Sequence, residues 1–203
     1  MNKGLVIVLS GPAGSGKGTV IRALMENDEN VALSVSATTR DPRPGEVEGV
    51  HYYFISKAEF ERRIKEGDIL EYNYYCDNYY GTPKSELERA TAAGRDIILE
   101  IDVNGAMQIK RLFPEAVNVM LTPPTAKSLE ARLRGRGTET EEVILRRLAR
   151  AKEEIELLSE YDYLLINEDG KPDECAERLA YIIRAERLRA SRSPDFAKSF
   201  YEE

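Results

Sequence analysis

A glycine-rich segment that ends in a lysine carries the clearest chemical signal in the sequence. It has the G-x-x-x-x-G-K spacing of a phosphate-binding P-loop and stands between an apolar run and a helical pattern. Glycines let backbone N–H groups turn towards phosphate oxygens, and the helix start adds its positive end. Lys17 is expected to reach the β- and γ-phosphates of a nucleoside triphosphate as a point charge. The predicted triphosphate-binding residues are Gly11, Pro12, Ala13, Gly14, Ser15, Gly16, Lys17, Gly18 and Thr19.

One position of this loop departs from the common pattern. Gly18 follows the lysine, where P-loops usually carry a Ser or Thr whose hydroxyl ligates Mg²⁺. Thr19 comes one position later and is expected near the α-phosphate. We therefore assign no direct protein ligand to Mg²⁺ and expect phosphates and water to carry the ion, because Mg²⁺ keeps its water readily.

Two carboxylates stand at the end of a later apolar run. Glu100 and Asp102 are two positions apart, which places them on one face where the predicted strand 96–101 ends. P-loop enzymes carry an acid near Mg²⁺ at the end of a second strand. We predict that both residues belong to the site and that Asp102 contacts Mg²⁺ through water. The alternative is that they are ordinary strand-end acids that face solvent.

The spacing of apolar residues predicts the elements that position these groups. Runs rich in Val, Ile and Leu predict buried strands at 5–9, 96–101, 117–121 and 163–166. Helical patterns separate these runs, so we predict an α/β protein with a P-loop three-layer fold and a mostly parallel sheet. A capping box, Thr138-x-x-Glu141, predicts that a further helix starts near Thr138.

Two regions interrupt this alternation and are interpreted as insertions into a single domain. Residues 34–83 hold seven of the eleven tyrosines, and residues 122–157 are rich in arginine. The predicted core comprises residues 1–33, 84–121 and 158–203. Aromatic residues beside basic ones also suit a stacking platform for single-stranded nucleic acid. Acidic residues surround these tyrosines and repel a polyanion, so we interpret most of the tyrosines as the core of the insertion.

Composition narrows the expected partners and location. The 203 residues include 29 Lys and Arg against 36 Asp and Glu, a net charge of −7. This balance argues against a duplex nucleic-acid binder and against a polybasic membrane anchor. The two cysteines, Cys76 and Cys175, argue for a reducing compartment and against a disulfide framework. We expect a cytoplasmic protein with neither a nucleic-acid polymer nor a membrane as its partner, and its oligomeric state is left open.

Further motifs resemble those of the guanylate kinase family. The most specific block is Ser34-Val-Ser-Ala-Thr-Thr-Arg-Asp-Pro-Arg-Pro-Gly-Glu46, and similar segments follow in order through Asn167-Glu-Asp, so the resemblance covers nearly the whole chain. It implies a nucleoside-monophosphate kinase with a core, a monophosphate-binding insertion (34–83) and a mobile lid (122–157). The implied reaction is ATP + GMP ⇌ ADP + GDP with Mg²⁺, a step in GMP recycling and GTP supply, and dGMP is a second expected acceptor.

The resemblance also implies a GMP site. Arg40 and Arg43 flank a proline turn, so both guanidiniums can clamp one phosphate dianion. A carboxylate at Glu71 matches guanine N1–H and the 2-amino group, whereas adenine offers an acceptor at N1 and has no 2-amino group. Ser36 and Thr82 are expected to donate hydroxyls to guanine O6. The expected GMP-binding residues are Ser36, Arg40, Arg43, Tyr52, Glu71, Tyr80, Thr82, Glu100 and Asp102.

The basic insertion is expected to act on the ATP phosphates. The resemblance implies that Arg132, Arg136 and Arg146 reach them on lid closure and form the catalytic set together with Lys17. Asn167 resembles the position that contacts adenine, which adds it to the ATP site.

Four other residues with reactive side chains are not assigned to the site. Arg147 and Arg150 are interpreted as a solvated face of the lid helix, and Cys76 and His51 are interpreted as structural.

Two other functions fit parts of the same pattern. One is a non-catalytic guanylate-kinase-like module that binds phosphorylated partners through the monophosphate pocket; the presence of Lys17 and the lid arginines argues against it. The other is a related kinase for a different phosphorylated small molecule, against which Glu71, Ser36 and Thr82 argue.

Overall fold

A five-stranded parallel sheet forms the core of the molecule. The computed structural model describes residues 3–135, 137 and 139–200. The strand order is β2-β7-β1-β8-β9, and every neighbouring pair is parallel. The strands are β1 (Val6–Ser10), β2 (Val31–Leu33), β7 (Asp96–Glu100), β8 (Val117–Thr122) and β9 (Tyr163–Ile166). The predicted α/β class and its four buried strands are confirmed within one residue at each end, whereas the three-residue β2 was missed.

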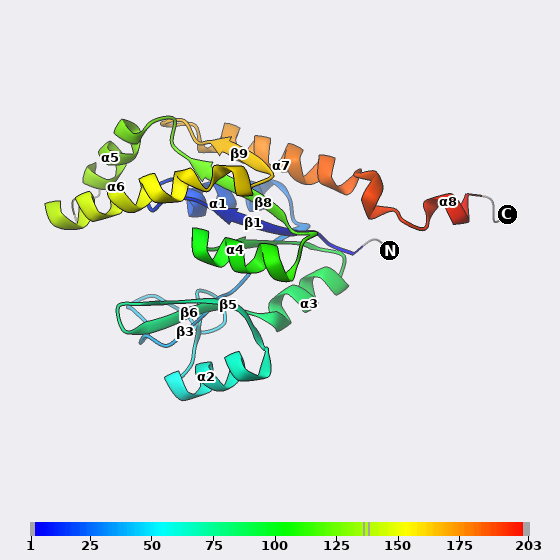
Figure 1. Cartoon of the computed structure of the whole chain (residues 1–203), viewed down its shortest axis with the longest axis horizontal. Helices are drawn as coiled ribbons and strands as arrows, with labels where there is room; N and C mark the ends of the chain where they lie inside the picture. The colour runs from blue at the N-terminus through cyan, green and yellow to red at the C-terminus, as the bar shows by residue number, and fades with distance from the viewer. Residues whose placement is uncertain (1–2, 136, 138, 201–203) are drawn as a thin grey trace.

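Helices cover both faces of this sheet (Figure 1). One face carries α1 and α7, and the other carries α3 and α4. Ile7 and Leu9 of β1 are buried on the first face and Val8 on the second, as the alternation of side chains along a strand requires. The helices are α1 (Lys17–Asn27), α3 (Lys84–Ala92), α4 (Val103–Leu112) and α7 (Pro172–Arg187). This is the predicted three-layer arrangement.

The tyrosine-rich region folds as a second sheet with a helix of its own. The strand order is β4-β3-β6-β5, and only the β3–β4 pair is parallel. Phe60 is fully buried and stacks on Tyr79 at a ring distance of 5.1 Å. The elements are β3 (Ala37–Thr38), β4 (Tyr53–Phe54), α2 (Lys57–Glu66), β5 (Ile69–Tyr75) and β6 (Asn78–Pro83).

The interpretation of most tyrosines as core of this insertion is wrong for three of them. Tyr72, Tyr74 and Tyr75 of β5 are 40%, 50% and 52% exposed. The hydrophobic core of the insertion is small and Phe60 already fills it, so these rings lie outside, where Tyr74 packs against Tyr79 at 4.8 Å.

The arginine-rich region consists of α5 (Ala126–Gly135) and α6 (Glu141–Glu156), which pack through Leu129, Leu133 and Ile144. The predicted helix is present and begins close to Thr138, a residue outside the described part of the chain, but the capping residue differs. Thr140 caps α6 instead, because its hydroxyl accepts a hydrogen bond from the Val143 N–H at 3.5 Å.

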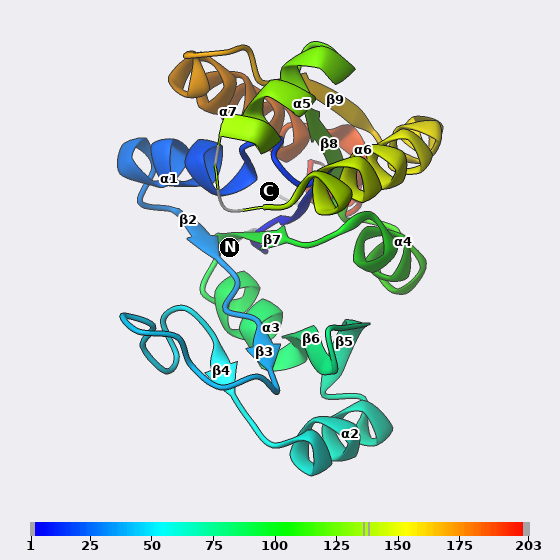
Figure 2. The same cartoon turned by 90° about the vertical axis from the view of Figure 1, so that its left-hand side faces the viewer.

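The two insertions lie on opposite sides of β1 and β7 (Figure 2). The strands of the second sheet fall within 34–83, and α5 and α6 fall within 122–157. The remaining elements are the 3₁₀ helices η1 (Leu158–Glu160) and η2 (Ala190–Arg192) and the short helix α8 (Phe196–Ser199), which projects from the core (Figure 1). Within the described residues, every helix is too short or too polar to cross a membrane.

A buried carboxylate fixes the edge of the core sheet that is opposite to the P-loop. Asp96 is 1% exposed, and its Oδ1 accepts a hydrogen bond from the Leu5 N–H at 2.8 Å. Its Oδ2 accepts from Arg187 Nη2 at 2.6 Å and Nε at 3.0 Å, which ties α7 to the start of β7. The two-pronged donation compensates for the cost of burying the charge.

Arg187→Ala is expected to lower the free energy of unfolding by about 3 kcal/mol, because it leaves the buried Asp96 carboxylate without its cation. Urea unfolding monitored by circular dichroism measures this change. Arg184→Ala on the same helix is the control, with an expected change within about 0.5 kcal/mol. Adding Asp96→Asn to Arg187→Ala should recover part of the loss; a double variant with additive losses would contradict the ion-pair explanation.

Candidate functional site

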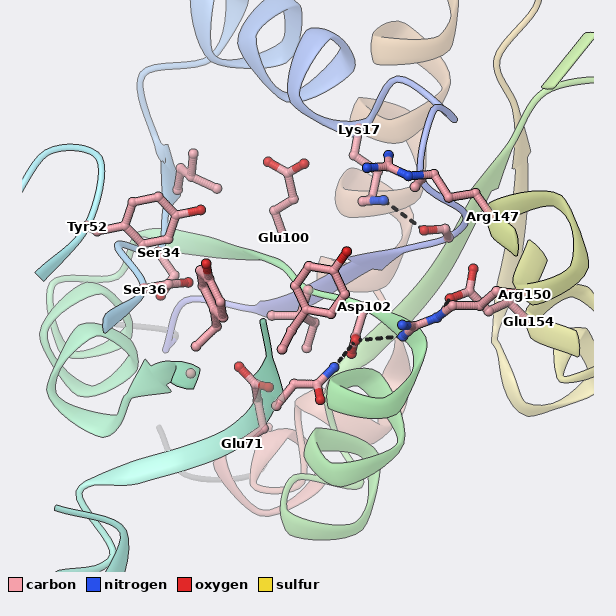
Figure 3. A pocket seen from close by; sticks show the side chains of 18 of the residues that line it. Lys17, Ser34, Ser36, Tyr52, Glu71, Glu100, Asp102, Arg147, Arg150 and Glu154 are labelled. Carbon is pink, nitrogen blue, oxygen red and sulfur yellow. Dashed lines mark hydrogen bonds and ion pairs between the residues drawn. The ribbon is translucent and has the colours of Figure 1, made fainter. Parts of the chain in front are cut away.

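A cavity of about 600 Å³ lies between the core, the insertion and the lid (Figure 3). It opens at the carboxyl ends of β1 and β7, the edge at which parallel sheets bind ligands. The predicted site residues that line it are Gly11, Ala13, Lys17, Ser36, Tyr52, Glu71, Tyr80, Glu100, Asp102 and Arg146. The structure therefore brings together groups from three separate regions of the sequence.

The P-loop connects β1 to α1 and depends on glycine. Gly11 and Gly16 have φ of 141° and 94°, values that side chains rarely adopt. A Cβ at Gly11 would also lie 2.1 Å from the Leu121 carbonyl oxygen. Lys17 Nζ donates to the Gly11 carbonyl at 2.7 Å, which holds the ammonium group over the loop. The Lys17 ammonium group and the N-terminal end of α1 thus lie at one end of the cavity.

Two predicted ATP-site residues brace the P-loop outside the cavity lining. Arg132 Nη1 and Asn167 Nδ2 both donate to the Ser15 carbonyl oxygen, at 3.0 and 2.8 Å. Arg132 also donates to the Asn167 carbonyl at 2.6 Å and pairs with Asp169. Ser15 Oγ and Asn167 Oδ1 are buried and have no hydrogen-bond partner among the described residues.

A buried carboxylate occupies the opposite end of the cavity. Glu71 on β5 is 4% exposed, and its Oε1 accepts from the Thr82 hydroxyl at 2.6 Å. Burial raises the pKa of Glu71 to about 7, although the Thr82 hydrogen bond opposes the shift. Its Oε2 lies 2.6 Å from where a Cβ of Gly105 would be, so only glycine leaves this space. The hydroxyl proton of Thr82 is used by Glu71 here, and a bond from Thr82 to guanine stays a prediction.

The predicted phosphate clamp is only partly assembled around the cavity. Arg40 donates through both Nη atoms to Glu46 at 2.6 Å and lies over the Tyr52 ring at 5.0 Å. This fork lowers the pKa of Glu46 to about 2. Tyr52 and Tyr80 line the cavity, whereas Arg40 lies outside the lining and the Arg43 side chain is exposed. Glu46 therefore orients Arg40, a role that the sequence interpretation did not include.

Glu100, rather than Asp102, is the carboxylate that faces the P-loop. Its Oε2 lies 3.6 Å from where a Cβ of Gly18 would be. Burial raises the pKa of Glu100, and the charge of Lys17 opposes this shift. Both Asp102 oxygens already accept hydrogen bonds, Oδ1 from Gly105 N at 2.9 Å and Oδ2 from Asn73.

The solvated-face interpretation of the lid helix is wrong. Arg147 and Arg150 both line the cavity (Figure 3), as Arg146 does. Arg150 pairs with Asp102 at 3.0 Å, and Arg147 pairs with Glu139 at 2.8 Å. The four-residue spacing of Arg146, Arg150 and Glu154 places them on one helix face, a signal that could have revealed this face of the lid. The remaining predicted lid residue, Arg136, lies outside the described residues.

Ser34, Asn73 and His51 are among the other lining residues that were missed. The buried Ser34 hydroxyl has no partner among the described residues. Asn73 donates to Asp102, and His51, which was interpreted as structural, lines the cavity while its Nδ1 accepts from the Val47 N–H at 3.0 Å. Cys76 lies in the exposed turn between β5 and β6, with φ of 48°.

Comparisons with known proteins agree with one another. A family model described as guanylate kinase matches residues 3–186. The chain is 48% identical over 193 residues to "Guanylate kinase" of Desulfitobacterium hafniense, covering 95% of this chain and 96% of that protein. It is 50% identical over 191 residues to "Guanylate kinase" of Lactiplantibacillus plantarum, covering 94% and 92%. The crystal structure of guanylate kinase from Anaplasma phagocytophilum superposes with a TM-score of 0.74 at 34% identity, covering 94% of this chain and 90% of that one.

Glu71→Gln is expected to change the pH dependence of stability. Because burial raises the pKa of Glu71 from 4.5 to about 7, the folded protein binds more protons than the unfolded chain between these values. The stability of the unsubstituted protein should therefore fall across this range relative to Glu71→Gln, by about 3 kcal/mol in total. Urea unfolding at pH 4.5, 6 and 8 measures the difference.

Glu26→Gln, an exposed substitution on α1, is the control for this series. A constant stability difference between Glu71→Gln and the unsubstituted protein from pH 4.5 to pH 8 would contradict the assigned environment of Glu71.

Proposed function

The chain belongs to the guanylate kinase family, and we propose that its cavity holds GMP at the Glu71 end and ATP at the Lys17 end. The activity is ATP:GMP phosphotransfer, with ADP and GDP as products. Identity near 50% over almost the whole chain favours this enzyme over the non-catalytic module and over a kinase for another small molecule. This assignment of the two ends rests on one observation: the P-loop lysine and a buried carboxylate lie at opposite ends of the same cavity.

Glu71 selects guanine. Guanine N1–H and the 2-amino group donate side by side, so one carboxylate satisfies both. Adenine would place an acceptor against this buried carboxylate and leave it unpaired, which discriminates strongly in sites built for such bonds. Thr82 keeps one oxygen of Glu71 in place, and Gly105 provides the space for the other. Ser36 lines the same cavity and donates to the guanine edge.

The GMP phosphate binds beside Tyr52 and Tyr80, whose rings are in contact. Tyr52 and Tyr80 line the cavity, and Arg40 lies over the Tyr52 ring. Glu46 holds the Arg40 guanidinium in a fixed plane, which reduces the entropy lost when a phosphate binds beside it. Arg43 closes on the phosphate from the same proline turn.

ATP binds on the P-loop, with its phosphates at Lys17 and the backbone N–H groups between Ala13 and Thr19. Arg132 and Asn167 keep the loop in shape from behind, and the Asn167 side chain meets the adenine. Arg146 and Arg147 line the cavity from the lid and approach the transferring phosphoryl group. Arg136 is proposed to join them on closure.

Transfer proceeds by in-line displacement. An ionised oxygen of the GMP phosphate attacks the γ-phosphorus, the bond to the β,γ-bridging oxygen breaks, and that oxygen leaves with ADP. No general base is needed because the attacking oxygen carries no proton. Catalysis therefore rests on positioning and on neutralising charge on the transferring group, which Lys17 and the lid arginines provide. Closure of the lid excludes water, which would otherwise hydrolyse ATP.

The residues around Gly18 fit a Mg²⁺ ion that arrives with ATP. Gly18 offers no hydroxyl, and the Glu100 carboxylate faces this position from β7. We propose that Glu100 holds the ion through water, in place of the Asp102 contact expected from the sequence. Mg²⁺ would supply neutralisation of the β- and γ-phosphate charge.

Other expectations from the sequence stay predictions. They are acceptance of dGMP, a cytoplasmic location, the lack of a nucleic-acid or membrane partner, and the division into core, insertion and lid at the stated boundaries.

Lys17→Met is expected to lower kcat roughly 100-fold or more, because a cation aimed at the transferring phosphoryl group is lost. A coupled assay of ADP release with ATP and GMP measures this change. Lys152→Met, an exposed lysine on α6, is the control and should retain the original kcat. The same assay with dGMP, AMP, CMP and UMP tests the guanine assignment, and preference for AMP over GMP would overturn it.

Gly105→Ala should raise the KM for GMP roughly tenfold while the KM for ATP stays within about twofold, since the new methyl group displaces the Glu71 carboxylate and loses about one hydrogen bond. Gly135→Ala is the matched control, because nothing lies within 4 Å of a Cβ at that position. An equal rise in both KM values for Gly105→Ala would mean that Glu71 is not the guanine-binding group.

A further inference from the structure

Asp102 connects the core, the insertion and the lid through a single carboxylate. Oδ1 accepts from Gly105 N at the start of α4, at 2.9 Å. Oδ2 accepts from Asn73 Nδ2 on β5 of the insertion and from Arg150 Nη2 on α6 of the lid, the latter at 3.0 Å (Figure 3). Parts of the chain that are far apart in sequence thus share one acceptor group.

A second carboxylate directs Arg150 towards this acceptor. Glu154, one turn further along α6, accepts from Arg150 Nε at 2.9 Å. Its side chain is 12% exposed, and burial raises its pKa while the bond from Arg150 opposes the shift. Arg150 therefore bridges Glu154 and Asp102 with two different nitrogen atoms. We call Asp102, Asn73, Arg150 and Glu154 the Asp102 junction.

Arg150 differs in this respect from the other cavity arginines of the lid. In Figure 3, Arg147 extends towards Lys17, whereas Arg150 turns towards Asp102. Its guanidinium is occupied by two carboxylates, Glu154 through Nε and Asp102 through Nη2. We therefore expect Arg150 to contribute little to neutralising the transferring phosphoryl group. Its bond to Asp102 depends instead on the positions of both the insertion and the lid.

We propose that Arg150 is a positioning residue that couples the lid to the GMP site through Asp102, so that GMP binding and lid closure on ATP stabilise each other. The inference rests on the proposed assignment of GMP and ATP to the two ends of the cavity. Asn73 donates to the same Asp102 oxygen that accepts from Arg150. When GMP holds the insertion in place, Asn73 therefore orients the oxygen to which the lid binds through Arg150. Closing the lid, in turn, brings a cation to Asp102, whose charge lies near that of Glu71.

Isothermal titration calorimetry measures this coupling directly. GMP is titrated into the protein alone and into the protein saturated with a non-hydrolysable ATP analogue and Mg²⁺. In the unsubstituted protein the analogue should tighten GMP binding by roughly 5-fold or more, and GMP should tighten analogue binding by the same factor. Arg150→Ala should keep the Kd of each ligand alone within about twofold and lose most of the mutual tightening.

Two further variants separate coupling from a general loss of structure. Arg134→Ala is the matched control, because Arg134 is a lid arginine paired within the lid to Glu130 and Glu141, and its coupling should equal that of the unsubstituted protein. Arg150→Lys should restore part of the coupling, because an ammonium group can reach Asp102 but cannot bridge both carboxylates as a guanidinium does. Circular dichroism melting checks that each variant is folded.

Asn73→Ala approaches the same junction from the insertion. It should also weaken the coupling between GMP and the ATP analogue. The double variant Asn73→Ala/Arg150→Ala should lose little more coupling than either single variant, because both substitutions disrupt the same Asp102 junction. This route keeps the inference testable even if Arg150→Ala does not fold.

The outcomes separate this inference from the proposed function. If GMP binds and the analogue tightens its binding equally in the unsubstituted protein and in Arg150→Ala, the inference is wrong and the proposed function stands. If GMP binds without any tightening by the analogue in the unsubstituted protein, the inference is also wrong. If the unsubstituted protein binds no GMP, both the inference and the proposed function are wrong.

Discussion

The cost of keeping the Glu71 carboxylate away from water constrains the rest of the site. Burial raises its pKa to about 7, so near neutral pH the group is poised between its two protonation states. Thr82 donates one hydrogen bond, and Gly105 leaves space beside the second oxygen without supplying a donor from a side chain. A ligand with two adjacent N–H donors relieves this cost, and one without them does not. We propose that base selection follows from this electrostatic penalty, which β5, β6 and α4 impose on Glu71.

Carboxylates orient two of the arginines at and beside the cavity. Glu46 fixes Arg40, and Glu154 with Asp102 fixes Arg150. Such preorganised charges need little rearrangement when a phosphate binds, which is the main way a protein assists phosphoryl transfer. The arrangement also explains how an acidic protein, with a net charge of −7, can bind highly anionic substrates: the positive charge is local and directed.

Features with a local physical cause could be predicted from the sequence. The Val- and Ile-rich runs predicted the strands because both faces of a parallel sheet are buried, and the spacing of glycines and Lys17 predicted the loop between β1 and α1 that lines one end of the cavity. Features that depend on contacts between distant segments could not be predicted. The bond from Asn73 to Asp102 joins residues 29 positions apart, and nothing in either segment indicates it. The capping residue was missed by two positions because Thr138 has a glutamate three residues later, as a capping box requires, whereas Thr140 has Val143 there and still caps the helix.

Glu71 is the buried carboxylate that we propose guanine pairs with, and its ionisation can be observed directly. Protein labelled with ¹³C at glutamate carboxyl carbons, with the Glu71 signal assigned by its loss in Glu71→Gln, would be titrated by NMR with and without GMP. The account predicts a pKa of about 7 for Glu71 in the free protein and a clear decrease when GMP binds, because the two guanine donors favour the carboxylate form. A pKa near 4.5 in the free protein, or one that GMP leaves unchanged, would contradict it.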